Sequence, residues 1–320
     1  MRDRIVIGSR GSKLALIQSN YVAGLLRAAA PGLTADIELI STRGDQIIDR
    51  PLAEIGGKGL FTEELERALR EKTIDLAVHS LKDLPVQDPG GLVVGAIPKR
   101  ATPNDALVAR EAKSLDTLKK SARVGTSSLR RKAQLLIKRP DLEIVDLRGN
   151  VDTRIAKVLE RKELDAAVLA CAGLERIGRA DVIAEILKPE VMLPAPGQGA
   201  LGIQCRADDA EVLTLLKKLD HADTRAEVTA ERALLEGLGG GCQAPIGALG
   251  ETVPSNAKSL TAVTEFKLSC GAFSMGAGPS VRIATHPVPG VGPEFIKDIV
   301  EVVLEKMRAG GADKIIAQYR

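Results

Sequence analysis

Short apolar runs and longer amphipathic stretches alternate along the first two thirds of the chain. Apolar runs bounded by polar or glycine-containing turns are typical of buried strands, whereas apolar residues three and four positions apart are typical of helices that cover a sheet. This alternation predicts an α/β fold with mostly parallel sheets. The predicted strands are Ile5–Ile7, Ile37–Ser41, Leu76–His79, Ile144–Leu147 and Ala166–Ala170, and helical periods cover Thr62–Arg70 and Asp152–Arg161.

Three sequence patterns occur twice in this part of the chain. The pairs are "VIGSRGSKLALIQ" (6–18) with "RVGTSSLRRKAQLL" (123–136), "IELISTRGD" (37–45) with "LEIVDLRGN" (142–150), and "TIDLAVHSLKDLP" (73–85) with "ELDAAVLACAGLE" (163–175). Such internal similarity indicates two similar α/β units. Ligands of open α/β sheets bind at the carboxyl ends of strands, where these patterns end, so we expect the two loop clusters to form a cleft.

A third unit is predicted from about His221 onward. The stretch "TRAEVTAERALLEG" has helical spacing and runs into the glycine turn "GLGGGCQAPIG", and a closing helix ends at Gly310 and Gly311. Residues 270–292 carry only weakly patterned strands. The turn places Cys242 among glycines, which makes it either an accident of loop composition or an attachment point that other groups approach closely.

Composition and charge limit the classes of partner that the protein can bind. The 320 residues are 44% hydrophobic, which is enough to bury several cores, and 45 basic residues nearly balance 42 acidic ones. Balanced charge and a 2% aromatic content without Trp argue against a nucleic-acid surface. No apolar run approaches the roughly 20 residues that cross a bilayer, and "MRDRIVIGSR" lacks the features of a secretory signal. We therefore expect a cytoplasmic protein with no nucleic-acid or membrane partner.

The four cysteines suggest neither a metal site nor a disulfide framework. Cys171, Cys205, Cys242 and Cys270 are far apart and include no C-x-x-C pair, so we expect reduced thiols and no bound metal. The chain also lacks a P-loop and a G-x-G-x-x-G motif after its first strand. "IGGKGLFTEELERAL" contains Lys58 in a glycine loop that suits either a mobile lid or an ordinary turn.

Arginines and hydroxyls gather where helices begin. In "VGTSSLRRKAQ", Ser127 or Ser128 is predicted to cap a helix whose first turn holds Arg130 and Arg131. Cations at this end oppose the helix dipole by about 0.3–1 kcal/mol each, which makes sense if they converge with backbone N–H groups on a bound anion. The alternative is a solvated helix start. "IGSRGSKLALIQ" repeats the arrangement with Ser9, Arg10 and Ser12.

Two further clusters follow predicted strands. In "LRGNVDTR", Arg148 and Arg154 either join the same basic cluster or are ordinary surface charges. "HSLKDLP" places Lys82 and Asp83 where ligand chemistry occurs in this fold class. An aspartate near several cations stays ionised, so it can accept N–H hydrogen bonds or stabilise a developing cation. His79, at the end of a buried strand, is expected to be a packed residue.

Taken together, these motifs resemble the porphobilinogen deaminase (hydroxymethylbilane synthase) family over about residues 4–250. The matching stretches are "GSRGSKLAL", "STRGD", "GGKGLFTEELE", "DLAVHSLKDLP", "VGTSSLRRKAQL", "LRGNVDTRI", "LPAPGQGALGIQCR", "TAERALL" and "GGGCQAPIGA". The resemblance implies two similar α/β domains resembling periplasmic binding proteins and a small α+β C-terminal domain. The implied boundaries are 1–99 with 200–217 for domain 1, 100–199 for domain 2 and 218–320 for domain 3.

The resemblance also implies an activity. A dipyrromethane cofactor is held by a thioether to Cys242, four porphobilinogen molecules condense onto it with loss of ammonia, and water releases 1-hydroxymethylbilane for tetrapyrrole and heme biosynthesis. The enzyme would be a transferase that acts as a cytoplasmic monomer on porphobilinogen. A six-ring chain carries about twelve carboxylates, which explains why arginines would line its site.

Site residues follow from the same resemblance. Asp83 is implied as the catalytic group that faces the pyrrole N–H groups, stabilises the cation and assists proton transfer. Cofactor binding is implied for Cys242, Lys82, Thr126, Ser127, Ser128, Arg130, Arg131 and Arg148. Substrate binding is implied for Arg10, Ser12, Gln18, Lys58, Arg148, Arg154, Arg176 and Gln198.

The chain departs from the family pattern at three places. Gly240 stands where many relatives have Glu, which is expected to loosen the turn, and Glu54 replaces a basic residue. Residues 251–292 fit the pattern poorly, so the edge of the third domain is expected to be irregular. Two other functions stay open: an anion-binding receptor, which needs neither Cys242 nor Asp83, and a cysteine-nucleophile hydrolase, which needs a histidine beside Cys242.

Overall fold

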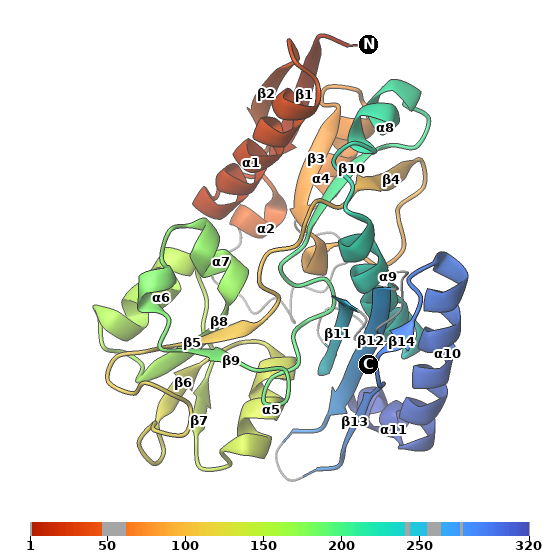
Figure 1. Cartoon of the computed structure of the whole chain (residues 1–320). Coiled ribbons are helices and arrows are strands. Elements are labelled where there is room, and N and C mark those ends of the chain that lie inside the picture. The colour runs from red at the N-terminus through yellow and green to blue at the C-terminus, as the bar shows by residue number, and fades with distance from the viewer. Residues whose placement is uncertain (1, 47–61, 241–243, 255–263, 276–277, 320) are drawn as a thin grey trace. The chain divides into compact units, whose positions relative to one another are not determined.

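The computed structural model describes residues 2–46, 62–240, 244–254, 264–275 and 278–319. The chain divides into two compact units (Figure 1). The first unit contains Met1–Ala101 and Gly199–Thr224, and the second unit contains Thr102–Gln198 and Arg225–Arg320.

The first unit is built on a five-stranded sheet in the order β2-β1-β3-β10-β4. Its strands are β1 (Arg4–Ser9), β2 (Thr34–Leu39), β3 (Leu76–Ser80), β4 (Leu92–Ala96) and β10 (Leu201–Arg206). β1 pairs in parallel with β2 and β3, whereas β10 lies antiparallel between β3 and β4. Four strands therefore share one direction, and the fifth comes from a distant part of the sequence.

Helices cover both faces of this sheet. The helix α1 (Lys13–Ala29) buries Val22 and Leu26 in one core together with Ile5 and Ile7. The helix α4 (Glu63–Arg70) packs Leu65 and Leu69 on the other face. The remaining elements of the unit are α2 (Arg43–Gln46), η1 (Leu81–Asp83) and α8 (Ala210–Leu216).

The first sheet of the second unit repeats this topology. Its order is β7-β6-β8-β5-β9, in which β6 pairs in parallel with β7 and β8, and β5 lies antiparallel between β8 and β9. The strands are β5 (Asp105–Ala109), β6 (Arg123–Gly125), β7 (Glu143–Val145), β8 (Ala166–Ala170) and β9 (Glu185–Leu187). Each twice-occurring sequence pattern thus contains strands that hold equivalent places in the two sheets: β1 and β6, β2 and β7, β3 and β8.

Helices of the second unit follow these strands in the expected order. They are α5 (Leu129–Lys138), α6 (Val151–Leu159), α7 (Cys171–Arg176) and η2 (Ala180–Val182). The helix α5 packs Leu135 against Val124 and Val168 on one face of the sheet. The helix α6 lies against β5 and β8 and buries Ile155 and Val158.

A smaller antiparallel sheet closes the chain. It consists of β11 (Ile246–Pro254), β12 (Thr264–Phe273), β13 (Ser280–Ala284) and β14 (Val288–Pro289), with β12 paired to the other three. The helices near it in sequence are α9 (Ala222–Gly237), α10 (Pro293–Ala309), α11 (Ala312–Ile316) and η3 (Ala317–Tyr319). Figure 1 shows α10 alongside β12, where Val303 and Met307 share a core with Phe266.

These observations confirm the fold class, with two similar α/β sheets of mostly one strand direction and a small C-terminal α+β part. The predicted irregular edge is not seen in the described part of 251–292. There β11 and β12 pair residue by residue, from Ile246 opposite Ala272 to Pro254 opposite Thr264. The three domain boundaries stay a prediction. Within the described ranges, no helix has the length and apolar character needed to span a membrane.

Candidate functional site

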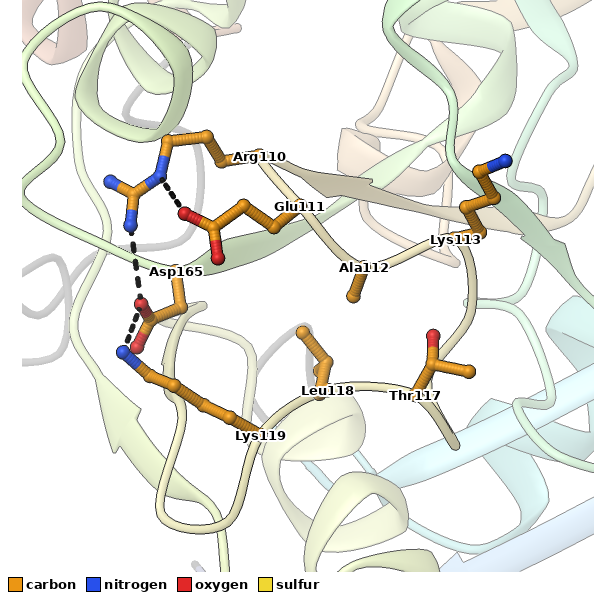
Figure 2. A pocket seen from close by; sticks show the side chains of 8 residues that line it. All are labelled: Arg110, Glu111, Ala112, Lys113, Thr117, Leu118, Lys119 and Asp165. Carbon is orange, nitrogen blue, oxygen red and sulfur yellow. Dashed lines mark hydrogen bonds and ion pairs between the residues drawn. The ribbon is translucent and has the colours of Figure 1, made fainter.

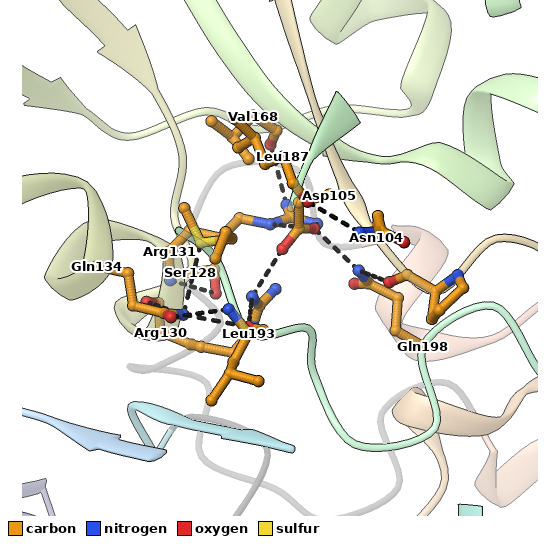
Figure 3. A network of polar contacts seen from close by, with 12 residues as sticks. Asn104, Asp105, Ser128, Arg130, Arg131, Gln134, Val168, Leu187, Leu193 and Gln198 are labelled. Atoms are coloured by element: carbon orange, nitrogen blue, oxygen red, sulfur yellow. Dashed lines mark hydrogen bonds and ion pairs between the residues drawn. The ribbon is translucent and has the colours of Figure 1, made fainter. Parts of the chain in front are cut away.

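A single buried carboxylate organises the carboxyl end of β8 in the second unit. Asp105, the first residue of β5, is 0% exposed and pairs in register with Ala170, the last residue of β8. Its Oδ2 accepts a hydrogen bond from Arg130 Nη1 at 2.7 Å, and its Oδ1 accepts from Arg131 Nη2 at 2.7 Å and Arg131 Nε at 3.0 Å (Figure 3). Two of the predicted cofactor arginines therefore share one anion.

Both arginines are also anchored to backbone carbonyls. Arg130 Nη1 donates to Leu193 O at 2.6 Å, and Arg131 Nη1 donates to Val168 O at 3.0 Å. Burial raises the pKa of Asp105, but the charges of Arg130 and Arg131 outweigh it and hold that pKa well below its ordinary value. Burial in turn lowers the pKa of Arg130. The cluster of one carboxylate and two guanidinium groups retains a net positive charge, which suits an anionic ligand.

Gln198 joins the same cluster from a distant part of the sequence. Its Nε2 donates to Asp105 Oδ1 at 3.0 Å and to Pro103 O at 2.7 Å. Gln134 closes the network on the other side, where its Nε2 donates to Leu193 O at 3.1 Å and its Oε1 accepts from Leu193 N at 2.8 Å. The structure thus brings Arg130 and Arg131, predicted from one motif, together with Gln198, predicted from another.

The hydroxyl residues before α5 shape its N-terminus. Ser128 is the N-cap and accepts from Arg131 N at 3.4 Å, as the sequence predicts for one of the two serines. Thr126 is buried, and its Oγ1 accepts from Ser128 N at 3.2 Å. Ser127 Oγ donates to Leu147 O at 3.1 Å and accepts from Leu147 N at 3.0 Å. The Ser127 bonds fasten this turn to the residue before Arg148.

The other predicted arginines of the second unit lie on neighbouring loops and helices. Arg148 follows β7, and Arg176 ends α7, which begins directly after β8. Arg154 lies on α6, where its Nε donates to Gly149 O at 2.8 Å. All three are half-buried. They flank the carboxyl ends of the parallel strands, where ligands of this fold class bind.

In the first unit, the predicted residues surround the ends of β1 and β3. Ser12 is the N-cap of α1, with its side chain accepting from Ala15 N at 3.3 Å. Gln18 is buried, and its Nε2 donates to Ser80 Oγ at 3.0 Å, which ties α1 to the last residue of β3. Arg10 follows β1 and is half-buried.

The turn η1 presents the predicted catalytic group. It starts directly after β3, and Leu81 N donates to Ala200 O at 3.0 Å, which holds the turn beside the start of β10. Leu81 is buried, Lys82 is half-buried and Asp83 is exposed. A solvent-accessible carboxylate on a turn with a buried anchor can meet a ligand without losing its position.

His79 is buried, as predicted, and neutral. Its pKa is lowered to about 4, mainly by burial, while the nearby Gln204 amide acts in the opposite direction and the charge of Arg10 acts in the same direction as burial. The folded protein therefore holds an uncharged imidazole near neutral pH.

This imidazole makes stability depend on pH. Between about pH 6.5 and pH 4 the unfolded chain protonates His79 and the folded chain does not, so we expect the free energy of unfolding to fall with pH by up to about 3 kcal/mol. Urea unfolding of the wild type and of His79→Gln at pH 7 and pH 4.5 measures the effect. An equal loss in both proteins on acidification would contradict it.

Sequence reasoning missed two buried carboxylates. Asp105 has the signal of a charged residue that opens the apolar run "ALVA", but its partners lie far along the chain. Glu231 on α9 is 0% exposed and accepts from Gly197 N at 2.6 Å and Gly250 N at 2.9 Å. It links the loop before Gln198 to β11, and nothing in its helical motif distinguishes it from a surface glutamate.

Cys242, Lys58 and Glu54, for which the sequence makes predictions, lie outside the described residues. The other three cysteines are buried thiols with desolvation as the main cause of their raised pKa values, which are about 12 for Cys171, 11 for Cys205 and 12 for Cys270. Such thiols are poor nucleophiles. Among the described residues, no group of His, Cys, Asp and Glu is arranged to hold a metal ion.

Gly240 is packed more tightly than the predicted loosening of its turn suggests. A Cβ added there would lie 2.4 Å from Ile246 Cδ1 and 3.0 Å from Leu235 Cδ1. A glutamate at this position would require these side chains to move.

A surface pocket of about 390 Å³ lies at the other end of β5 (Figure 2). Lys119 Nζ lies 2.7 Å from Asp165 Oδ1, and Arg110 Nη2 lies 3.7 Å from the same oxygen. None of the predicted site residues lines it. The pocket is thus separate from the Asp105 cluster, and two of its basic side chains are already paired.

Comparison with known proteins identifies the chain. A family model described as "Porphobilinogen deaminase, dipyromethane cofactor binding domain" matches residues 5–214, and its C-terminal domain matches residues 225–265. The porphobilinogen deaminase of Desulforudis audaxviator is 53% identical over 100% of this chain and 99% of its own length. That of Desulforamulus reducens is 46% identical over 100% of this chain and 99% of its own length. Among solved structures, the methionine binding protein MetQ is 17% identical with a TM-score of 0.44, covering 72% of this chain and 94% of that chain.

These matches define the class of protein to which the chain belongs. The chain is an enzyme, a transferase of tetrapyrrole biosynthesis with a dipyrromethane cofactor domain. It belongs to the porphobilinogen deaminase family. The anion-binding receptor and the hydrolase are therefore not supported.

Proposed function

We propose that this chain joins four porphobilinogen molecules to a dipyrromethane on Cys242, with Asp83 as the catalytic group. The observation that carries the assignment of residues is the Asp105 cluster, because three predicted ligand-binding side chains meet there at the expected end of the sheet. The cofactor supplies the free pyrrole carbon to which each new ring is joined. The chain's own residues bind, orient and neutralise the charged groups.

The donor set of the second unit fits this cofactor. Among the described residues, the contacts of Arg130 all run through Nη1, so Nε and Nη2 remain for a carboxylate. Ser128 and the N–H groups at the start of α5 add donors beside it. We assign Arg130, Arg131 and Ser128, with Thr126, Ser127, Lys82 and Arg148, to the acetate and propionate arms of the cofactor.

Asp83 is assigned to the reacting ring. An ionised carboxylate near the pyrrole N–H stabilises the positive charge that develops when ammonia leaves, and can accept the proton released after the carbon–carbon bond forms. We assign substrate carboxylates to Arg10, Arg148, Arg154 and Arg176. Ser12, Gln18, Lys58 and Gln198 complete the proposed substrate-binding set.

The same proposal includes the setting in which the enzyme works. We infer a cytoplasmic monomer that takes free porphobilinogen, without a nucleic-acid or membrane partner. The near balance of 45 basic and 42 acidic residues supports the absence of a nucleic-acid or anionic-membrane partner, because attraction to a polyanion would need an excess of positive charge. Size-exclusion chromatography with light scattering measures the oligomeric state.

Intact-mass measurement tests the attachment. Protein made in cells that synthesise porphobilinogen is expected to exceed the mass of its sequence by one dipyrromethane, and Cys242→Ala is expected to lack the increment. Cys171→Ala is the matched control, because that thiol is buried with a pKa near 12 and should leave the increment unchanged. A bare wild-type mass, or an increment that persists in Cys242→Ala, would overturn the assignment.

A further inference from the structure

The duplicated sheets provide an internal comparison of equivalent positions. In the first unit, His79 lies opposite Gly202, and Gln204 lies opposite Ala77 two residues further along β10. In the second unit, Leu169 lies opposite Ala106, and Val108 lies opposite Ala167. The pair His79 and Gln204 therefore occupies the places that Leu169 and Val108 hold in the second sheet.

Both pairs face a helix across a buried surface. Ala77 lies opposite Gln204 and two residues before His79 on the same face of β3, and it packs in the core with Leu65 and Leu69 of α4. Leu169 and Val108 are 3% and 0% exposed in the second unit, so an apolar pair is compatible with this place in the fold. The polar pair of the first unit is buried to the same degree, with His79 6% and Gln204 0% exposed.

The polar pair is not satisfied by the fold. Among the residues that the structure describes, neither Gln204 Nε2, Gln204 Oε1 nor His79 Nε2 has a hydrogen-bond partner. A buried polar atom without a partner destabilises the folded state, whereas an apolar pair of similar size carries no such cost. Stability therefore gives no reason for His79 and Gln204 at a place where the second sheet uses leucine and valine.

Their neighbours belong to the proposed active site. Arg10 lies near enough for its charge to act on His79, and the Gln204 amide lies beside the imidazole. His79 precedes Ser80 and the turn η1, which carries Asp83. A neutral imidazole has one N–H donor and one acceptor nitrogen, and the amide has both kinds of group, so a small shift of either side chain would let the two hydrogen-bond, although neither polar atom of Gln204 has a partner among the described residues.

We propose that His79 and Gln204 are positioning residues for the reaction, in which Gln204 orients the imidazole and the imidazole steadies Arg10 and the turn that carries Asp83. This inference rests on the proposed function. The pair acts through Arg10 and Asp83 and makes no contact with the reacting atoms. An imidazole that stays uncharged adds no second positive charge near Arg10, whose guanidinium we assign to a substrate carboxylate.

Replacing His79 and Gln204 with the residues at the equivalent places of the second sheet tests this proposal. In the double variant His79→Leu with Gln204→Val, we expect the melting temperature of the cofactor-loaded enzyme to stay the same or rise. We expect kcat/KM for porphobilinogen to fall about tenfold or more, with a rise in KM because Arg10 is displaced. The single variant His79→Gln keeps a neutral donor and acceptor at this place. We therefore expect it to retain most of the wild-type kcat/KM that the double variant loses.

A control variant distinguishes the positioning role of His79 and Gln204 from a general effect of changing a buried polar group. Ser19 on α1 also has a buried hydroxyl without a partner among the described residues, and Ser19→Ala should leave kcat and KM unchanged. A double variant with wild-type kcat/KM, or one that is unfolded or less stable in proportion to its lost activity, would overturn the positioning role. Absence of product with the loaded wild type would instead overturn the proposed function.

Discussion

Replacing Asp83 with Asn is expected to slow turnover of porphobilinogen by about 100- to 1,000-fold while leaving the fold and the attached cofactor intact. The side chain is exposed on η1, so an amide of the same size disturbs no core packing. The amide has no negative charge to stabilise a developing cation and cannot accept a proton at neutral pH. Steady-state kcat, intact mass and the melting temperature are the measurements.

Asp88 offers a matched control for Asp83. It is an exposed acid on the same connection between β3 and β4, and Asp88→Asn removes the same charge from the same segment. We expect its kcat to stay within about twofold of the wild type, because surface charges away from the reacting atoms contribute little at physiological ionic strength. If Asp83→Asn kept a kcat within a few fold of the wild type, Asp83 would have no catalytic role.

Replacing Asp105 with Asn is expected to destabilise the second unit by about 3–5 kcal/mol. The change leaves two guanidinium groups buried without their shared carboxylate, with Arg130 and Arg131 at 5% and 9% side-chain exposure. Freed from Asp105, the two arginines would also lose the orientation that we assign to cofactor binding. Urea unfolding gives the stability, and intact mass gives the fraction of protein that carries the cofactor.

The pH dependence of folding stability is a second test of the role of Asp105. The pKa of Asp105 is lowered in the folded state, so its stabilising contribution is present above its unfolded pKa near 4 and is lost as pH falls toward the lower folded value. Asp105→Asn should therefore lose less stability than the wild type when the pH falls below 4. Equal losses would show that Asp105 is not the ionised partner of the two arginines.

An exposed ion pair is the control for Asp105. Arg4 Nε lies 2.8 Å from Asp36 Oδ2, with 66% and 46% of the side chains exposed. Solvent screens such a pair, so Asp36→Asn should cost less than about 1 kcal/mol. A similar cost for Asp36→Asn and Asp105→Asn would mean that burial does not strengthen the Asp105 cluster.

Local patterns predicted much of the structure correctly. Apolar periodicity identified the strands that became β1, β3 and β8, and the serines before α1 and α5 cap those helices as expected. The repeated patterns predicted two similar units. These predictions succeeded because strand and helix periods and N-caps depend on neighbours within a few residues.

Pairings between distant residues could not be predicted in this way. Apolar periodicity alone did not reveal that β10 inserts between β3 and β4, although the family resemblance implied that this segment completes domain 1. The position of β10 is what places Gln204 beside His79. In the second unit, β5 places Asp105 next to both arginines of α5, and the loop before β10 brings Gln198 to Asp105 Oδ1, the oxygen that also accepts from Arg131.

The sequence by itself determined the family, the repeated α/β units and the residue types that can bind a poly-acid and transfer a proton. The tertiary structure decided that Arg130 and Arg131 share the buried anion Asp105, and that His79 is a neutral group next to the Gln204 amide, which has no partner within the described part of the chain. The physical reason is that strand order and register bring together residues far apart in the chain. Their burial and charge then depend on neighbours that no local pattern specifies.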